Sequence, residues 1–305
     1  MKYYILKRLF HSIFVLIGIS IVVFVILHLT GDPAALLMPM DATPEQVAQF
    51  RKEMGFTDPL IIQYGRFIQG VLQGDFGSSF RHHQPALTLV LERMPATIQL
   101  TLAAMAVAMV IALPVGIISA IRRNTLLDHI GMTGALLGQS TPVFWLGIML
   151  ILIFSVTLQW FPSSGRGEIQ HLILPAITLG MYTMARTARM MRSSMLEVLG
   201  QEYMKTAKAK GLRPTAVILK HALKNASIPV VTIVGMELGT LLGGAVITET
   251  IFAWPGVGRL AVQAIYNRDY PVVQASVFLL ASIFVLINLF VDILYTYLDP
   301  RVKLE

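Results

Sequence analysis

Long apolar stretches separated by short polar segments are the main pattern of this chain. Six of them reach about twenty residues, the length that a helix needs to cross the hydrocarbon of a bilayer. They cover residues 9–29, 97–121, 130–158, 172–191, 226–250 and 273–296. The pattern predicts an all-α membrane protein with six transmembrane helices. Pro142 lies inside the third stretch, where we expect it to kink the helix.

Composition supports the membrane class. Hydrophobic residues make up 55% of the chain and charged residues 13%, against roughly 25% charged residues in soluble domains. The first apolar stretch follows Lys2, Lys7 and Arg8, as in a signal peptide, but it is longer than a signal-peptide core. We therefore expect an uncleaved first helix. Cysteine is absent, which excludes disulfides, a thiolate metal site and a cysteine nucleophile.

The distribution of Lys and Arg predicts the orientation. With the N-terminus inside, the inner segments hold 16 of these residues and the outer segments hold 8, five of them in the long segment 31–96. Cationic short loops remain in the cytoplasm, whereas long loops follow this rule poorly. We expect both termini to be cytoplasmic. The net charge of +7 then reflects loops that face anionic lipid, with no need for a nucleic-acid partner.

The outer segment 31–96 is too long for a passive connector. Thr43–Gln46 has the form of a capping box, with Thr as N-cap, Pro as first helical residue and Gln as reciprocal partner. Helical periodicity returns over Pro59–Leu72, and a glycine-containing turn follows at Gln73–Ser79. The segment is expected to be an ordered extracytoplasmic cap, serving either as a structural lid or as a docking surface.

A basic island, Gln201–Pro229, lies between the fourth and fifth apolar stretches. It holds six Lys and Arg residues against one carboxylate. Residues 202–210 are good helix formers, Gly211 suits a left-handed helix end, and Pro214 suits the first turn of a second helix at about 214–224. We predict a helix–Gly–helix docking surface. The small residues Ala207 and Gly211 are expected to let a partner's groove close around the turn.

The island also resembles a known loop. Tyr203-x-Lys205-Thr206-Ala207-x-Ala209-Lys210-Gly211, followed by His221–Asn225 and Pro229, is similar to the cytoplasmic loop of binding-protein-dependent ABC transporter permeases. The general loop has Glu-Ala-Ala, three residues, then Gly, and only Ala207 and Gly211 match it. The departure resembles the peptide/nickel branch. Further matches run along the chain, at Lys7–Leu9, Gly31–Pro33, Asp58–Leu60, Gly74–Ser79, Phe252–Gly258, Arg268–Pro271 and Asp299–Arg301.

The resemblance implies an import permease subunit of the bacterial inner membrane. Its expected parts are a first helix at 1–30, an outer cap at 31–96, a permease core at 97–297 and a cytoplasmic tail at 298–305. The implied partners are a second, similar permease, two cytoplasmic ATPases and an extracytoplasmic substrate-binding protein. ATP and Mg²⁺ would be used by the ATPases, since this chain lacks a GxxxxGK[ST] phosphate loop. We expect it to bind no cofactor and to have no catalytic residues.

The resemblance also implies which residues touch an ATPase. The ATPase-coupling residues are expected to be Tyr203, Lys205, Thr206, Ala207, Lys210, Gly211, His221 and Asn225.

Acidic residues inside the apolar stretches are candidates for the transport pathway, because membrane carboxylates usually face a cavity or a partner. Glu237 lies near the middle of the fifth stretch and either meets a substrate ammonium group or packs at a subunit interface. Glu249 and Asp292 lie nearer the edges. The pair His82–His83 is expected to be solvated, since two imidazoles alone make a poor metal site.

The resulting hypothesis is an ATP-driven importer of dipeptides or oligopeptides, of which this chain forms half of the pathway. Nickel and glutathione remain open as alternative cargoes. An ATP-independent channel or secondary carrier is an alternative of another class, but such a protein has no need of a cationic docking hairpin. An intramembrane hydrolase is excluded by the lack of a histidine partner for Ser140 in the later apolar stretches.

Overall fold

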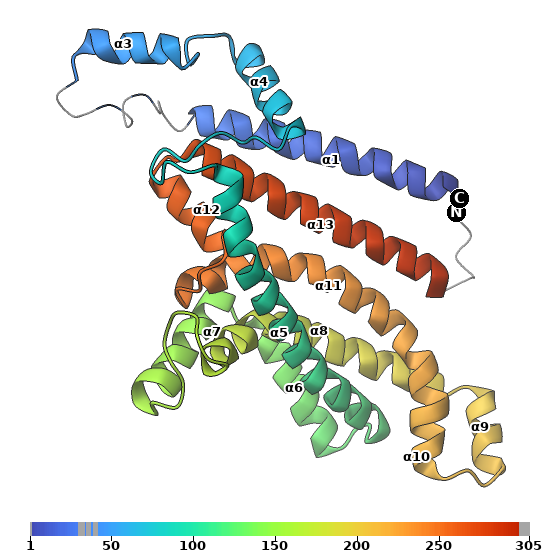
Figure 1. Ribbon diagram of the computed structural model, residues 1–305. Coiled ribbons are helices and arrows are strands. Elements are labelled where there is room, and N and C mark those ends of the chain that lie inside the picture. The colour runs from blue at the N-terminus through green and yellow to red at the C-terminus, as the bar shows by residue number, and fades with distance from the viewer. Residues whose placement is uncertain (1, 30–33, 35–37, 39–41, 299–305) are drawn as a thin grey trace. The chain divides into compact units, whose positions relative to one another are not determined.

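The computed structural model describes residues 2–29, 34, 38 and 42–298 of the chain. The motifs at 31–33 and 299–301, like nearly all of the predicted tail, lie outside this part. Within it, helices form the regular structure, apart from one isolated bridge between Ser78 and Pro85. The prediction of an all-helical protein is therefore confirmed, and Figure 1 shows the course of the helices.

Four helical segments of the described chain are long and apolar enough to cross a membrane. They are α1 (Lys2–Leu29), α5 (Ala86–Ile121), the segment Pro214–Ile251 that ends in α11 (Leu223–Ile251), and α13 (Tyr270–Leu298). A fifth span is present if a bent pair of helices near Pro142 counts as one. Each of these coincides with a predicted span, so the apolar pattern places these helices correctly.

The helix break at Pro142 is larger than predicted. In place of one kinked helix, α6 (Leu126–Ser140) ends and α7 (Val143–Leu150) begins, continuing into the π-helical turn η1 (Ile151–Thr157). The two helical parts meet at 107°. Thr141 has an extended backbone with φ −81° and ψ 124°, because the ring of a following proline disfavours the helical conformation. The helix is thus interrupted at Pro142, as expected, but by a full break and not a kink, and a single span over 130–158 stays a prediction.

The fourth predicted span lies in α8 (Gln170–Leu199), which is long enough to cross a membrane but not apolar enough. Three arginines, Arg186, Arg189 and Arg192, belong to this helix. Helices α6, α7 and α11 all pack against α8, so most of its surface faces protein. A helix in such a position needs no apolar surface all round. The number of six spans therefore remains a prediction.

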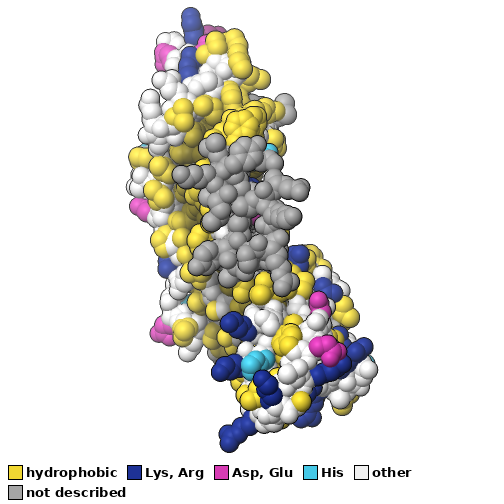
Figure 2. Space-filling model, turned by 90° about the vertical axis from the view of Figure 1, so that its right-hand side faces the viewer, with side chains coloured by type: hydrophobic (Ala, Val, Ile, Leu, Met, Phe, Trp, Pro, Cys, Tyr) yellow, Lys and Arg dark blue, Asp and Glu magenta, His cyan; other side chains and the backbone are white. Residues whose placement is uncertain are grey.

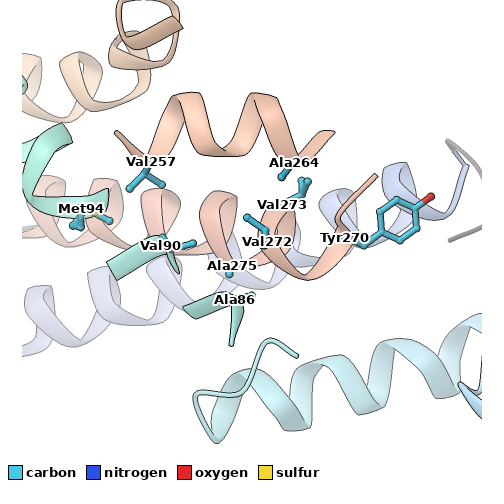
Figure 3. Close-up of a cluster of buried hydrophobic side chains, with 9 residues drawn as sticks. All are labelled: Ala86, Val90, Met94, Val257, Ala264, Tyr270, Val272, Val273 and Ala275. Atoms are coloured by element: carbon cyan, nitrogen blue, oxygen red, sulfur yellow. The ribbon is translucent and has the colours of Figure 1, made fainter. Parts of the chain in front are cut away.

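The described chain divides into two compact units. We call Ile98–Trp254, with the chain from Leu286 onward, the bundle unit, and Lys2–Thr97 with Pro255–Val285 the cap unit. The core of the cap unit lies where the start of α5, α12 (Val257–Tyr266) and the start of α13 meet (Figure 3). Its buried side chains are Ala86, Val90, Met94, Val257, Ala264, Tyr270, Val272, Val273 and Ala275.

The cap unit contains the predicted outer helices, α3 (Pro44–Glu53) and α4 (Leu60–Leu72). The capping box is confirmed: the Thr43 backbone N–H donates to Gln46 Oε1 at 2.8 Å, and the Gln46 N–H donates to Thr43 Oγ1 at 3.3 Å. The turn at 73–79 is confirmed as well, with positive φ at Gly74 and Gly77. A hydrogen bond of 2.8 Å between Ser20 Oγ and the Tyr64 hydroxyl fastens α4 to α1.

Candidate functional site

The basic island forms a hairpin, which we define as Glu202–Asn225. Its first arm is α9 (Glu202–Ala209), and Gly211 turns the chain with φ +72°. The second arm begins with Pro214 at the start of α10 (Pro214–Ala216) and passes through the π-helical turn η2 (Val217–Ala222) into α11. The predicted helix–Gly–helix is present, but its second helix continues without a break into the fifth apolar stretch.

Hydrogen bonds hold the two arms of the hairpin together. Asn225 Nδ2 donates to the Tyr203 hydroxyl at 2.7 Å, joining residues 22 positions apart, and also to the His221 carbonyl at 3.4 Å. The structure thus brings three of the predicted coupling residues into contact. Lys205 Nζ lies 2.7 Å from Glu202 Oε1 within the first arm, where both side chains are exposed.

An apolar cluster anchors the hairpin to α8, within the bundle unit. Met204 and Ala207 of the first arm are buried against methionines of α8 and small residues of the second arm. The cluster consists of Ala120, Met191, Met195, Met204, Ala207, Val217, Ala222, Ala226 and Val230. Ala207 is only 8% exposed, so the expectation that it faces a partner's groove is wrong. A small residue also suits close packing within one chain, and the burial of Met204 beside it leaves this side of the helix no room for a partner.

The opposite side of the hairpin is open and cationic. Lys205, Thr206, Lys210 and Gly211 are exposed, and no atom lies within 4 Å of a Cβ built on Gly211. Figure 2 shows Lys and Arg side chains gathered around a histidine at the end where α9 and α10 lie. A groove of about 480 Å³ adjoins the hairpin. Its lining residues are Ile121, Leu199, Lys208, Leu212, Pro214, Val217 and Ile218.

Glu237 lies on α11 in an internal ion pair. Its side chain is 2% exposed, and its Oε1 accepts a hydrogen bond of 2.6 Å from Nη1 of Arg186 on α8. Its Oε2 accepts a second hydrogen bond, of 3.2 Å, from the Thr183 hydroxyl. The side chain of Arg186, by contrast, is 45% exposed. Of this pair, Arg186 is the residue whose side chain is exposed.

A second ion pair joins α6 to α8. Arg192 donates from Nε to Asp128 Oδ1 and from Nη2 to Asp128 Oδ2, both at 2.7 Å. The backbone N–H of Asn124 donates to the same carboxylate at 2.9 Å. Asp128 is 3% exposed and Arg192 25% exposed. Both carboxylate oxygens are therefore occupied by charge-assisted or backbone hydrogen bonds.

The exposed residues of α8 and α11 include several polar groups, and we call this set of residues the polar face. On α8 they recur at helical spacing, at Tyr182, Arg186, Ser193 and Glu197. On α11 they are Met236, Thr240, Gly243, Ile247 and Thr250. Figure 1 shows the two helices side by side, and they are in extensive contact.

Other helices of the bundle unit expose apolar side chains instead. On α5 and α6 these include Leu102, Val110, Ile118, Ile130 and Leu137. Hydrocarbon tolerates such a surface but not an exposed guanidinium. In a membrane, α5 and α6 are therefore suited to face lipid, whereas the polar face needs water or protein against it.

Sequence reasoning missed Arg186, Arg192 and Asp128 as partners. The sequence places the arginines among the cytoplasmic cations that set the orientation, whereas Glu237 lies in an apolar stretch and Asp128 in the short segment between two of them. Arginines at three-residue spacing within a helix, together with isolated carboxylates in other helices, were the available signal. Glu249 is also buried, near the end of α11. His82 and His83 are both exposed, as expected for a solvated pair.

Comparison with known proteins adds sequence relatives along the whole chain. The dipeptide transport system permease protein DppB of Alkalihalophilus pseudofirmus is 45% identical, with 98% of this chain and 99% of that protein covered. The glutathione transport system permease protein GsiC is 44% identical in Salmonella paratyphi A and 43% in Escherichia coli K12, with 98% of each chain covered.

Solved structures share the fold at lower identity. A chain of the MetNI methionine ABC transporter, in an inward-facing conformation, is 23% identical with a TM-score of 0.59. The match covers 69% of this chain and 96% of that one. A chain of an amino acid ABC transporter is 16% identical with a TM-score of 0.52, covering 70% of this chain and 94% of that one.

Two family models account for most of the sequence. Residues 1–101 match the N-terminal component of binding-protein-dependent transport system membrane proteins, and residues 112–304 match the inner membrane component of these systems. Together with relatives that align over 98% of its length, this places the chain as a multi-pass protein of the bacterial inner membrane. It belongs to the family of binding-protein-dependent transport system inner membrane components.

Proposed function

We propose that this chain is a permease subunit of an ATP-driven importer of dipeptides or oligopeptides. The relatives named for dipeptide and glutathione transport support a peptide cargo, and glutathione is itself a tripeptide. Nickel stays an alternative cargo. A self-sufficient channel or carrier is disfavoured by membership in a family of binding-protein-dependent systems.

The braced hairpin is the observation that carries this proposal. Its inner side is buried in an apolar cluster with α8, and its outer side is exposed and cationic. A surface held in this way does not deform when a partner pushes on it, because packed side chains transmit displacement. We assign its exposed residues, led by Lys205, Thr206, Lys210 and Gly211, to contact with a cytoplasmic ATPase. That partner would bind and use ATP and Mg²⁺.

The polar face is proposed to line half of the translocation pathway. Its exposed side chains are unsuited to lipid, and a second, similar permease would complete the wall on the other side. In this arrangement α8 is the sixth membrane-crossing helix, shielded from lipid by its neighbours. The expected outer segment 31–96 would receive cargo from the substrate-binding protein.

The proposal is tested by uptake of radiolabelled dialanine into proteoliposomes that contain the complex co-purified with this chain. We expect uptake to require ATP and the binding protein. A Gly211→Arg variant should insert normally but lose ATP-coupled uptake by tenfold or more, since the bulk lies on the docking turn.

Gly165→Arg is the matched control for this variant. Gly165 also has a positive φ, +89°, and no atom within 4 Å of an added Cβ, so the local strain is comparable while the hairpin is untouched. Equal losses in both variants would contradict the placement of the coupling surface. Uptake by the chain alone, without ATP, would instead establish a channel or carrier.

A further inference from the structure

The Arg186–Glu237 pair reverses the charge expected in the pathway. Glu237 was considered as a group that meets a substrate ammonium, but its side chain is 2% exposed and both oxygens accept hydrogen bonds from this chain. An incoming ammonium would have to displace Arg186 to reach it. The residue of the pair that belongs to the polar face is Arg186, with 45% of its side chain exposed.

Arg186 has unused capacity for an anion. A guanidinium carries five N–H donors in a planar fork, and the hydrogen bond to Glu237 employs Nη1. Because Glu237, itself held by the Thr183 hydroxyl, binds one side of the fork, the side chain is oriented before any ligand arrives. Such an oriented fork matches the two oxygens of a carboxylate.

A second arginine adds to the positive charge here. Arg189 follows Arg186 by three positions, so the two are neighbours on the surface of α8. Its Nε is buried and has no hydrogen-bond partner among the residues that the structure describes. Glu237 offsets only one of these two charges. The next acidic residue along α8 is Glu197, about two turns further on.

We propose that Arg186, positioned by Glu237, binds the C-terminal carboxylate of a peptide during its passage along the polar face. This inference rests on the proposed function and names the chemical group of the cargo that the pathway recognises. A free carboxylate supplies the negative charge that the site lacks, and a bidentate contact with it is stronger than one with a neutral amide. Peptides whose C-terminus is blocked would forfeit this contact.

The test compares dialanine with dialanine amide as cargo of the complex in proteoliposomes. In Arg186→Gln, uptake of dialanine should fall by about tenfold or more, as expected for loss of a charge-assisted hydrogen bond, while uptake of the amide should change by less than about twofold. Arg186→Lys keeps the charge but not the fork and should fall in between. Arg123→Gln removes an exposed cation elsewhere in the bundle unit and should leave both rates unchanged.

Two results would overturn the inference. Equal losses for the two peptides in Arg186→Gln would show that the guanidinium does not read the carboxylate. Failure of that variant to co-purify with the second permease would place Arg186 at a subunit interface. Absence of ATP-dependent uptake in the wild-type complex would instead refute the proposed function, which is a separate outcome.

If the binding protein prefers one of the two peptides, uptake rates no longer report on Arg186 alone. Where it rejects the amide, both peptides are measured by equilibrium binding to the complex without the binding protein. There, wild type should prefer dialanine, and Arg186→Gln should bind the two peptides with equal affinity. A preference unchanged by the substitution contradicts the proposal.

Discussion

Two arginine–carboxylate pairs lie on α8, six residues apart, and they differ in how far they are sealed. Arg192 binds both oxygens of Asp128 and is 25% exposed, whereas Arg186 binds one oxygen of Glu237 and is 45% exposed. The same two chemical groups therefore occupy two kinds of environment on one helix. The closed pair joins α6 to α8, and the open pair joins α8 to α11 while still presenting donors outward.

The difference shows that the role of an ion pair in a membrane protein follows from the exposed fraction of its side chains and not from the distance between its charged atoms. Both pairs are short, at 2.7 and 2.6 Å. In the closed pair every strong acceptor is occupied, so its effect is on stability. In the open pair a positively charged surface remains, so its effect is on what can lie against the polar face.

The largest effect is expected from breaking the closed pair. Asp128→Ala leaves Arg192 with an uncompensated charge, and the loss of a buried partner costs about 3–5 kcal/mol; we expect about 3, since Arg192 is 25% exposed. Thermal unfolding of the detergent-solubilised protein measures this. The double variant Asp128→Ala with Arg192→Met should recover much of the stability, and a double variant as unstable as the single one would contradict the assignment.

A smaller effect is expected from neutralising the open pair. Glu237→Gln keeps an acceptor oxygen for Arg186, and its amide N–H can donate to the Thr183 hydroxyl, but it removes the charge that orients the guanidinium. We expect the complex to assemble and dialanine uptake to fall roughly fivefold, corresponding to about 1 kcal/mol. Co-purification and initial uptake rates are the measurements. Loss of assembly with normal uptake per complex would favour a purely packing role for Glu237.

The smallest effect on stability is expected at the solvent-exposed pair of the hairpin. Lys205 and Glu202 have side chains 70% and 85% exposed, and exposed pairs contribute about 0–1 kcal/mol. Lys205→Gln should leave the unfolding temperature unchanged within error while lowering ATP-coupled uptake, because its charge faces the proposed ATPase. A marked drop in the unfolding temperature would show that side-chain exposure does not determine the order in which these three pairs contribute to stability.

Local rules of the backbone made much of the hairpin and the cap predictable. Gly211 was expected in the left-handed region because only glycine adopts it without strain, and its φ is +72°. Thr43 and Gln46 were expected to cap a helix because their side chains complement the first N–H groups. Such inferences need only neighbouring residues, and the structure agrees with them.

Side-chain direction and long-range pairing could not be predicted in this way. Ala207 could have faced a partner or its own chain, since its size suits both, and the structure buries it. Arg192 and Asp128 are 64 positions apart, so their contact depends on how α6 packs on α8. The partners of the polar residues of α8 could not be predicted for the same reason, because the positions of α6, α7 and α11 against α8 are known only from the fold.

The unbroken second arm of the hairpin has a mechanical consequence. Pro214–Ile251 is a helical segment of 38 residues, about 57 Å long at 1.5 Å per residue. Glu237 lies about 35 Å along this rod from its first residue. Pro229 lies inside α11, and proline is a common site of bending in a long helix. On the proposed function, a tilt imposed at the hairpin would move the part of α11 that carries Glu237, and with it the hydrogen bond to Arg186.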